Sequence, residues 1–297
     1  MGKRLRGVFT ALVTPFGNDG TFDEHTFEQL LERQLAAGVH GLVPCGTTGE
    51  TPALDEQEWA RIITLSVEAA AGRVSVVAGT GSNNTAQTVA RTRRARALGA
   101  DAALVVTPYY NKPNAEGLVS HYRTIAEEGG LPVVVYNVPS RTGLNLAPEL
   151  LLRIAEIPGI VGVKEASGHL GQAMTIHARR EPELALLSGE DELTCAMTLM
   201  GGDGVISVVS NVDPKGSIAL VEAALAGELD RAREVHYRQL PLIRALFAET
   251  NPVPAKAALA LMGLAEDRVR TPLAPASDAT RQALMAGLRH AGLAGSL

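Results

Sequence analysis

The segment AALVVTPYYNKPNAEGLVSHYRTIAEEGGLPVVVYN (102–137) shows the pattern from which the fold can be predicted. It contains two apolar runs, AALVVT (102–107) and PVVVYN (132–137), separated by an amphipathic stretch of helical length. The runs are continuously apolar rather than alternating, which is typical of parallel strands covered on both faces. Two such strands joined through a helix form one unit of a parallel α/β protein.

The same alternation continues on both sides of this segment. Strands are expected at 7–13, 41–44, 74–79, 102–107, 132–137, 160–166, 184–189 and 204–210. Eight strand–helix units within about 225 residues match the count and length of a (β/α)8 TIM barrel. A doubly wound sheet is the alternative fold, but no GxGxxG follows the first strand, and eight units are many for it.

Helices are indicated between the strands and again after the last one. In FDEHTFEQLLERQLAAG (22–38), Phe27, Leu30, Leu31 and Ala37 fall on one face. Asp55 with Glu58 three residues later predicts a capping box at the start of a helix.

After the predicted barrel the pattern is helical only. The segments at 229–247, 254–264 and 277–293 are the expected helices. We therefore expect a barrel over 1–225 and a C-terminal helical region over 226–297.

Composition and charge exclude several classes of protein. The 297 residues carry a net charge of −5 without a basic run, so neither a nucleic-acid partner nor a membrane partner is expected. No apolar stretch reaches the length of a membrane span, and the apolar N-terminal run fits a first strand better than a signal peptide. Cys45 and Cys195 form no CxxC, which suits a reducing compartment. The expected location is the cytoplasm.

Lys164 is the most informative single residue. The chain has five lysines against 22 arginines, and this one follows the apolar run Ile160-Val161-Gly162-Val163. In a barrel, the ends of the strands on the C-terminal side build the active site. Burial there disfavours the ammonium form, so a neutral amine becomes available to attack a carbonyl group. The alternatives are a solvated lysine paired with Glu165, or a lysine that contacts phosphate or a metal.

Tyr136 is expected on the neighbouring strand at a similar height. A tyrosine beside a Schiff-base lysine can move protons during imine formation and carbon–carbon bond formation. A core tyrosine with a hydrogen-bonded hydroxyl is the alternative.

Two loops offer groups that could hold carboxylates. In Gly46-Thr47-Thr48-Gly49-Glu50, backbone amides and two hydroxyls could act as fixed donors, although an ordinary turn would give the same pattern. Arg141, in the loop after the fifth strand, could grip a carboxylate bidentately or be simply solvated. The run 201–204, GGDG, is expected to be a turn rather than a phosphate loop, because no GK[ST] follows it.

The remaining polar side chains do not indicate a metal or a nucleobase. The seven histidines form no HxH or HExxH, which argues against a metal-dependent aldolase, and no metal or cofactor is expected. Tyr109 and Tyr110 could stack on a base, but no basic groove accompanies them.

In combination, six motifs resemble the dihydrodipicolinate synthase/N-acetylneuraminate lyase family of class I aldolases. The likeness runs over essentially the whole chain. The motifs are GTTGE (46–50), VTPYYNKP (106–113), YNVPSRTG (136–143), GVKEASG (162–168), LLSGED (186–191) and GVISVVSN (204–211). The resemblance implies a (β/α)8 barrel with a C-terminal helical region, assembled as a homotetramer that is a dimer of dimers.

The resemblance also implies residue roles. Lys164 would form a Schiff base with pyruvate, so no separate cofactor would be needed. Thr47 and Thr48 would bind the pyruvate carboxylate, and Gly189 and Ile206 would line the pyruvate pocket. Tyr136, Thr48 and Tyr110 would form a proton relay, with Tyr110 supplied by the neighbouring subunit.

Arg141 distinguishes substrates within the resembled family. Sialic acid lyases and sugar-acid aldolases typically lack this arginine, whereas synthases that condense pyruvate with L-aspartate 4-semialdehyde carry it. The segment ETNPVPAK (249–256) also resembles the synthases. The expected function is therefore that condensation, in lysine and diaminopimelate biosynthesis. An aldolase or dehydratase acting on 4-hydroxy-2-oxoglutarate or a keto-sugar acid is the enzymatic alternative, and a barrel that senses 2-oxo acids is the non-enzymatic one.

One part of the resemblance is incomplete. Relatives inhibited by lysine usually place histidines and an acidic residue in a pocket between subunits. The matching positions here are Glu56, Trp59 and Gln87, while Asn83 and Tyr109 fit the pattern. We therefore expect weak or absent inhibition by lysine.

Overall fold

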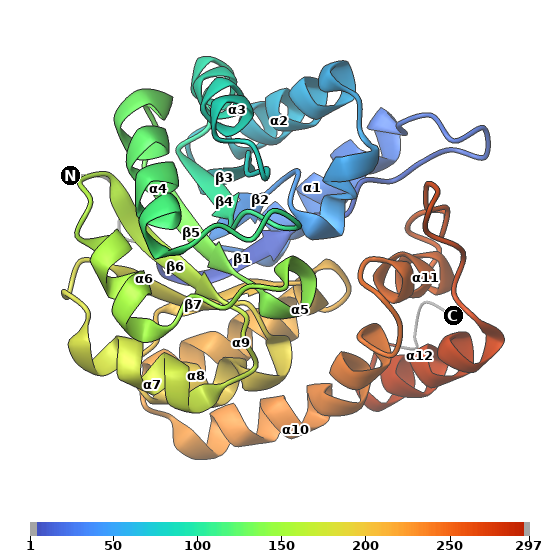
Figure 1. Ribbon diagram of the computed structural model, residues 1–297. Helices are drawn as coiled ribbons and strands as arrows, with labels where there is room; N and C mark the ends of the chain where they lie inside the picture. The colour runs from blue at the N-terminus through green and yellow to red at the C-terminus, as the bar shows by residue number, and fades with distance from the viewer. Residues whose placement is uncertain (1–4, 294–297) are drawn as a thin grey trace.

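A computed structural model describes residues 5–293 of the chain as a closed barrel of eight parallel strands surrounded by helices (Figure 1). The predicted (β/α)8 barrel is thus confirmed. Neighbouring strands in the barrel are neighbours in sequence, and β1 closes the ring against β8. The strands are β1 (Gly7–Ala11), β2 (Gly41–Val43), β3 (Ser75–Gly79), β4 (Ala102–Val106), β5 (Val133–Asn137), β6 (Ile160–Glu165), β7 (Ala185–Ser188) and β8 (Gly204–Ser207).

Twelve α-helices and four short 3-10 helices lie in the described part of the chain. The α-helices are α1 (Glu24–Ala37), α2 (Glu56–Ala70), α3 (Thr85–Ala97), α4 (Ala115–Gly129), α5 (Pro139–Thr142), α6 (Pro148–Ala155), α7 (Leu170–Arg179), α8 (Thr194–Leu199), α9 (Pro214–Leu225), α10 (Leu229–Leu246), α11 (Val253–Leu261) and α12 (Asp278–His290). The 3-10 helices are η1 (Thr47–Gly49), η2 (Thr51–Ala53), η3 (Asp191–Leu193) and η4 (Val209–Asn211). None of the helices within residues 5–293 is both long and apolar enough to cross a membrane.

The apolar strands are buried on both faces, as their sequence predicts. Alternate residues point into the barrel, where Phe9, Leu104, Tyr136 and Ile206 belong to one packed cluster. The residues between them point outward and pack under the ring of helices in a larger core. The barrel is therefore filled, and only its rims are free to bind ligands.

The start of helix α2 forms the predicted capping box. The Asp55 carboxylate accepts from the backbone N–H groups of Gln57 and Glu58, and the Glu58 side chain accepts from the backbone N–H of Asp55. In α1, Phe27, Leu30 and Leu31 are buried on one face.

The last strand is shorter than the sequence predicts. The apolar run predicts a strand over 204–210, but β8 ends at Ser207 and η4 follows. The cause is the buried Asp191, whose carboxylate accepts from the Ser207 hydroxyl and from the backbone N–H groups of Val208 and Val209. These bonds turn the chain away from the strand direction.

The three helices expected at the C-terminus form a layer against one side of the barrel, drawn in orange and red in Figure 1. Their apolar residues share a core with Val13 and Leu30 from the start of the chain and with η4. The domain boundary at 225/226 stays a prediction.

Candidate active site

The residues predicted to carry chemistry lie at or just after the C-terminal ends of the strands. Tyr136 and Lys164 are the penultimate residues of β5 and β6, and Gly189 directly follows β7. Thr47 and Thr48 lie in η1 after β2, and Arg141 lies in α5 after β5. In a (β/α)8 barrel this rim carries the catalytic groups.

Lys164 and Tyr136 contact each other at the centre of this rim. They are paired across the β5–β6 ladder, where a register shift between Val133 and Val134 precedes them. The Lys164 Nζ lies 4.3 Å from the centroid of the Tyr136 ring. Lys164 is only 5% exposed, so the amine is held largely out of water at the mouth of an apolar barrel.

Glu165 does not pair with Lys164. Successive strand residues point to opposite faces, so Glu165 lies outside the barrel lumen. Its carboxylate accepts from Asn137 Nδ2 at 3.0 Å, from the Ser167 N–H at 2.8 Å and from Gln172 Nε2 at 3.2 Å. The alternative of a solvated Lys164–Glu165 pair is therefore wrong.

Gly189 borders the lysine side chain directly. A Cβ atom built on Gly189 would lie 3.0 Å from Lys164 Cε and 2.6 Å from the Cβ of Ala166. Glycine therefore leaves the space that the lysine stem occupies. Ile206 is 1% exposed in the same interior cluster as Tyr136.

The loop after β2 is held by the C-terminal region. Thr48 is 2% exposed, and its hydroxyl accepts a hydrogen bond of 2.9 Å from the side-chain amide of Asn251. The backbone carbonyl of Asn251 in turn accepts from Arg141 Nη2 at 3.3 Å. Asn251 is thus hydrogen-bonded to both Thr48 and Arg141, which are predicted to bind substrate carboxylates.

The local sequence pattern does not indicate this role for Asn251. The residue stands before Pro252, far along the sequence from the barrel strands. The segment ETNPVPAK that contains it resembles the synthases but gives no role for Asn251. Its side-chain Oδ1 is buried without a hydrogen-bond partner.

Two acidic residues to which the sequence analysis gave no role, Glu190 and Asp191, follow Gly189 after β7. Burial and the neighbouring Asp191 carboxylate raise the pKa of Glu190, while the charges of Lys164 and Arg141 oppose that rise. Burial likewise raises the pKa of Asp191, although its hydrogen bond from Ser207 opposes the shift. Glu190 therefore lies within electrostatic range of both the amine and the guanidinium.

Tyr110 projects from the loop after β4. It is 90% exposed and has a left-handed backbone with φ 69°, which is uncommon for a residue other than glycine. Within one chain this side chain is open to solvent, so the relay through Tyr136, Thr48 and Tyr110 stays a prediction.

The residues matched to a lysine pocket lie around α2 and α3. Trp59 is fully buried and donates from Nε1 to the Gly79 carbonyl at 3.1 Å. Glu56 is paired with two arginines of α3. Gln87 is exposed on α3.

The other two residues of this set lie in loops close to Asn111. The backbone carbonyl of Asn83 accepts from Asn111 Nδ2 at 2.9 Å, and the Asn111 backbone N–H donates to the Tyr109 carbonyl at 2.8 Å. The Tyr109 side chain is 38% exposed. The role of all five positions stays a prediction.

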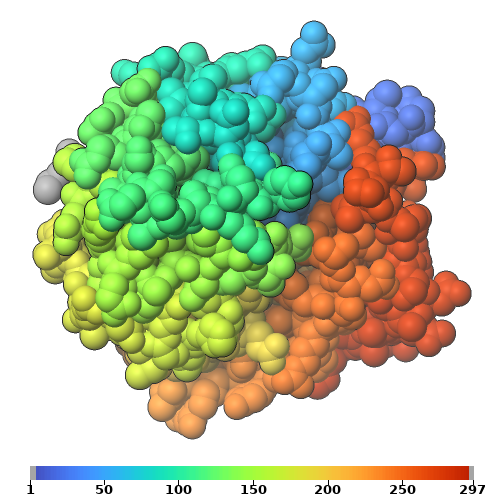
Figure 2. Space-filling model, viewed as in Figure 1, coloured from blue at the N-terminus to red at the C-terminus, as the bar shows by residue number. Residues whose placement is uncertain are grey.

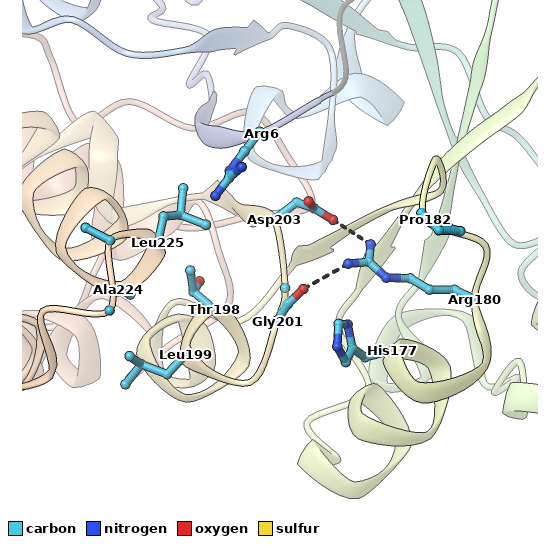
Figure 3. Close-up of a pocket in the computed structure, with 13 residues that line it drawn as sticks. Arg6, His177, Arg180, Pro182, Thr198, Leu199, Gly201, Asp203, Ala224 and Leu225 are labelled. Carbon is cyan, nitrogen blue, oxygen red and sulfur yellow. Dashed lines mark hydrogen bonds and ion pairs between the residues drawn. The ribbon is translucent and has the colours of Figure 1, made fainter.

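A cavity of about 690 Å³ lies at the opposite end of the barrel, between the ends of α7, α8 and α9 (Figure 3). Arg6, which precedes β1, and Asp203, which precedes β8, line it. Arg180 is bonded there to Asp203 and to the carbonyl of Gly201. This rim is the N-terminal one, so the cavity is separate from the residues around Lys164.

Within residues 5–293, no three His, Cys, Asp or Glu side chains are grouped so that they could hold a metal ion. Both cysteines are buried and free.

The chain is similar over almost its whole length to proteins of one family. The sequence model of the dihydrodipicolinate synthetase family matches residues 4–291. A 4-hydroxy-tetrahydrodipicolinate synthase of Thermomicrobium roseum is 50% identical over 284 residues, which are 96% of this chain and 94% of that protein. A synthase of the same name from Methanothrix thermoacetophila is 48% identical over 275 residues, which are 92% of each chain.

Solved structures agree with this similarity. The crystal structure of dihydrodipicolinate synthase from Thermotoga maritima superposes with a TM-score of 0.96 at 45% identity, covering 98% of this chain and 100% of that one. A dihydrodipicolinate synthase variant described as monomeric gives a TM-score of 0.95 at 45% identity, covering 97% of each chain.

Proposed function

The chain belongs to the dihydrodipicolinate synthetase family, and we propose that it condenses pyruvate with L-aspartate 4-semialdehyde to give 4-hydroxy-tetrahydrodipicolinate. The observation that carries this proposal is the buried Lys164 amine, 4.3 Å from the Tyr136 ring at the catalytic rim of the barrel. The names of the similar proteins support the choice of substrates.

The proposed reaction starts at the Lys164 amine. Its nitrogen attacks the C2 carbonyl of pyruvate and water leaves, which gives an imine. Loss of a proton from C3 then gives an enamine, because the protonated imine nitrogen accepts the electron pair. Tyr136 would move protons in these steps, and its contact with Lys164 supports this role.

The enamine carbon then attacks the aldehyde of the second substrate and forms the new carbon–carbon bond. The amino group of that substrate closes the ring by attack at C2 and displaces Lys164. One water molecule is released overall, and the amine of the lysine is regenerated. The chemistry uses the imine as its electron sink, so we propose no metal or other cofactor.

The two substrate carboxylates are assigned to different groups. Thr47 and Thr48, at the tight turn of η1, would bind the pyruvate carboxylate through fixed donors. Gly189 and Ile206 would line the same pocket. Arg141 would bind the carboxylate of the semialdehyde, and its bond to the Asn251 carbonyl orients the guanidinium.

We further propose that the chain acts in the cytoplasm as a homotetramer built from two dimers. Tyr110 supports a subunit contact there, because its 90% exposed ring is free to contact a second chain and its backbone is held in the left-handed region. In such an assembly Tyr110 would enter the site of the neighbouring subunit.

Borohydride reduction in the presence of pyruvate, followed by peptide mass mapping, tests the central step. We expect a reduced pyruvate adduct on Lys164. No adduct, or an adduct on Lys256, would contradict the proposal.

Replacing Arg141 by alanine tests the second substrate. We expect turnover of the semialdehyde to fall by about 100-fold, because a charge-assisted bidentate contact is lost, while the pyruvate adduct still forms. Arg123→Ala is the matched control, since Arg123 is exposed on α4. Full semialdehyde turnover by Arg141→Ala would instead show that Arg141 does not bind the carboxylate of this substrate.

A further inference from the structure

A buried ion pair connects the C-terminal helical region to the loop that carries Thr47 and Thr48. The Nζ of Lys256, on α11, lies 2.7 Å from Oε1 of Glu50, and the two residues are 206 positions apart. Their side chains are only 1% and 2% exposed. Figure 2 shows the C-terminal residues, in orange and red, packed against the blue N-terminal part of the chain.

Glu50 is held at both carboxylate oxygens. Oε1 receives Lys256, and Oε2 accepts the backbone N–H of Arg270 at 2.9 Å. The Glu50 backbone has φ 53° and ψ 36°, in the left-handed region that favours glycine. Contacts on the side chain therefore hold a backbone conformation that a glutamate seldom adopts unaided.

The conformation of Glu50 is coupled to that of the two threonines. Its backbone N–H donates to the Thr47 carbonyl at 3.1 Å and closes the turn of η1. From the other side of the loop, the Thr14 hydroxyl donates to the Gly49 carbonyl at 2.8 Å. A shift of Glu50 would therefore move the backbone N–H groups and hydroxyls of Thr47 and Thr48 together.

The surroundings of Lys256 contain few other charges. The ammonium lies 4.1 Å from the Phe16 ring centroid, and the Arg270 guanidinium lies 4.2 Å from the same centroid. Arg270 itself is bonded to Glu58, and the charge of Asp267 also acts on Lys256. Burial lowers the pKa of Lys256 to about 8, although Glu50 opposes the shift, so at neutral pH the Lys256 amine is mainly protonated.

We propose that Lys256 is a positioning residue for pyruvate: through Glu50 it fixes the loop whose threonines bind the pyruvate carboxylate. This inference rests on the function proposed above. Lys256 touches no reacting atom in this role. Its contribution is to keep the loop donors in one arrangement before the substrate arrives.

The concentration of pyruvate needed for half-maximal trapping by borohydride is the appropriate measurement. It reports pyruvate binding and imine formation, and it does not require the second substrate. A residue that only stabilises the fold would change the fraction of protein that can be trapped, but not the half-saturating concentration.

For Lys256→Met we expect the half-saturating pyruvate concentration to rise by about tenfold, because a charge-assisted hydrogen bond in the loop support is lost. The amount of adduct on Lys164 at saturating pyruvate should stay close to that of the parent protein. Lys256→Met leaves the Glu50 carboxylate buried without its partner, which can prevent folding. The double variant Glu50→Gln/Lys256→Met removes both charges and should show the same rise.

The ion pair Arg180–Asp203 provides the matched control. Its side chains are 5% and 6% exposed. The pair, drawn in Figure 3, lies at the opposite rim of the barrel, because Asp203 directly precedes β8. Arg180→Met should lower stability and leave the half-saturating pyruvate concentration unchanged.

The outcomes separate the two proposals. If the parent protein gives no adduct on Lys164, the proposed function fails. If the parent gives the adduct and a folded Lys256→Met or double variant keeps the parent half-saturating concentration, the positioning role fails. An equal rise in Arg180→Met would also overturn that role, because the effect would then be one of general stability.

Discussion

At the scale of single residues, the absence of a side chain at Gly189 leaves space for the Lys164 side chain. In Gly189→Ala the new Cβ would lie 2.6 Å from the Cβ of Ala166, and it would also press on Lys164 Cε and Cγ, at 3.0 and 3.1 Å. We expect imine formation with pyruvate to slow by about tenfold or more, since the amine is displaced from Tyr136. The measurement is the rate of borohydride inactivation at saturating pyruvate.

Gly171→Ala is the matched control for this substitution. Gly171 lies in α7, and a Cβ there would meet nothing within 4 Å. This variant should trap pyruvate at the parent rate. Equal rates in Gly189→Ala and the parent would show that the lysine stem has more freedom than the packing indicates.

The sequence predicts some contacts of Lys164 and misses others for a physical reason. Lys164 and Tyr136 are paired because both stand next to last in adjacent parallel strands, a relation that follows from strand order. Asn251 reaches Thr48 across 203 positions, and such a contact depends on how the C-terminal helices dock. No local pattern encodes that docking.

At the scale of elements, His121 links α4 to the start of α3. Its Nδ1 is 2.9 Å from the Thr85 hydroxyl, and burial lowers the pKa of His121 to about 4 from the ordinary 6.5. Between these two values the unfolded chain binds a proton that the folded chain does not. The free energy of unfolding should therefore fall as pH drops from 6.5 towards 4, by up to about 3 kcal/mol from this group.

Urea unfolding at pH 7 and pH 4.5 measures this contribution. His121→Gln should be less stable at pH 7 but lose less stability on acidification than the parent. His25→Gln is the control, because His25 is exposed on α1, and it should keep the parent pH dependence. Parallel losses in parent and His121→Gln would show that other groups cause the acid effect.

The pairing of α2 with α3 bears on inhibition by lysine. The Glu56 carboxylate is 2.7 Å from Arg91 Nη2 and 3.1 Å from Arg94 Nη1, and both guanidinium groups stack near Trp59. A carboxylate already paired with two cations attracts an added ammonium weakly. We expect L-lysine at sub-millimolar concentration to leave the rate of condensation nearly unchanged. Strong inhibition in that range would contradict this prediction.

Strand positions were predicted better than strand ends. All eight expected runs contain a strand, because continuous apolar runs fit a sheet that is covered on both faces. The predicted end of β8 was wrong because the buried Asp191 carboxylate accepts from the backbone N–H groups of Val208 and Val209. This is a tertiary contact, which the local sequence pattern does not show. The end of a strand is decided by such contacts rather than by propensity.

At the scale of the whole molecule, the C-terminal region is part of the site. The count of strand–helix units predicts the barrel, and the helical pattern after residue 225 predicts an added region. Neither predicts that this region would reach the rim through Asn251 and Lys256. Removal of the C-terminal helices should therefore affect pyruvate binding as well as stability.

The assembly can be tested through Tyr110, which is 90% exposed in one chain. Lys164→Ala lacks the amine, and Tyr110→Ala lacks the tyrosine that we propose enters a neighbouring site, so each variant alone should be nearly inactive. In a mixed dimer, the site that keeps Lys164 receives an intact Tyr110 from its partner. Random mixing by unfolding and refolding should therefore restore activity to about a quarter of the parent sites, since half of the dimers are mixed and each has one complete site. No recovery in the mixture, with parent protein refolding to full activity alongside, would show that Tyr110 does not act across subunits.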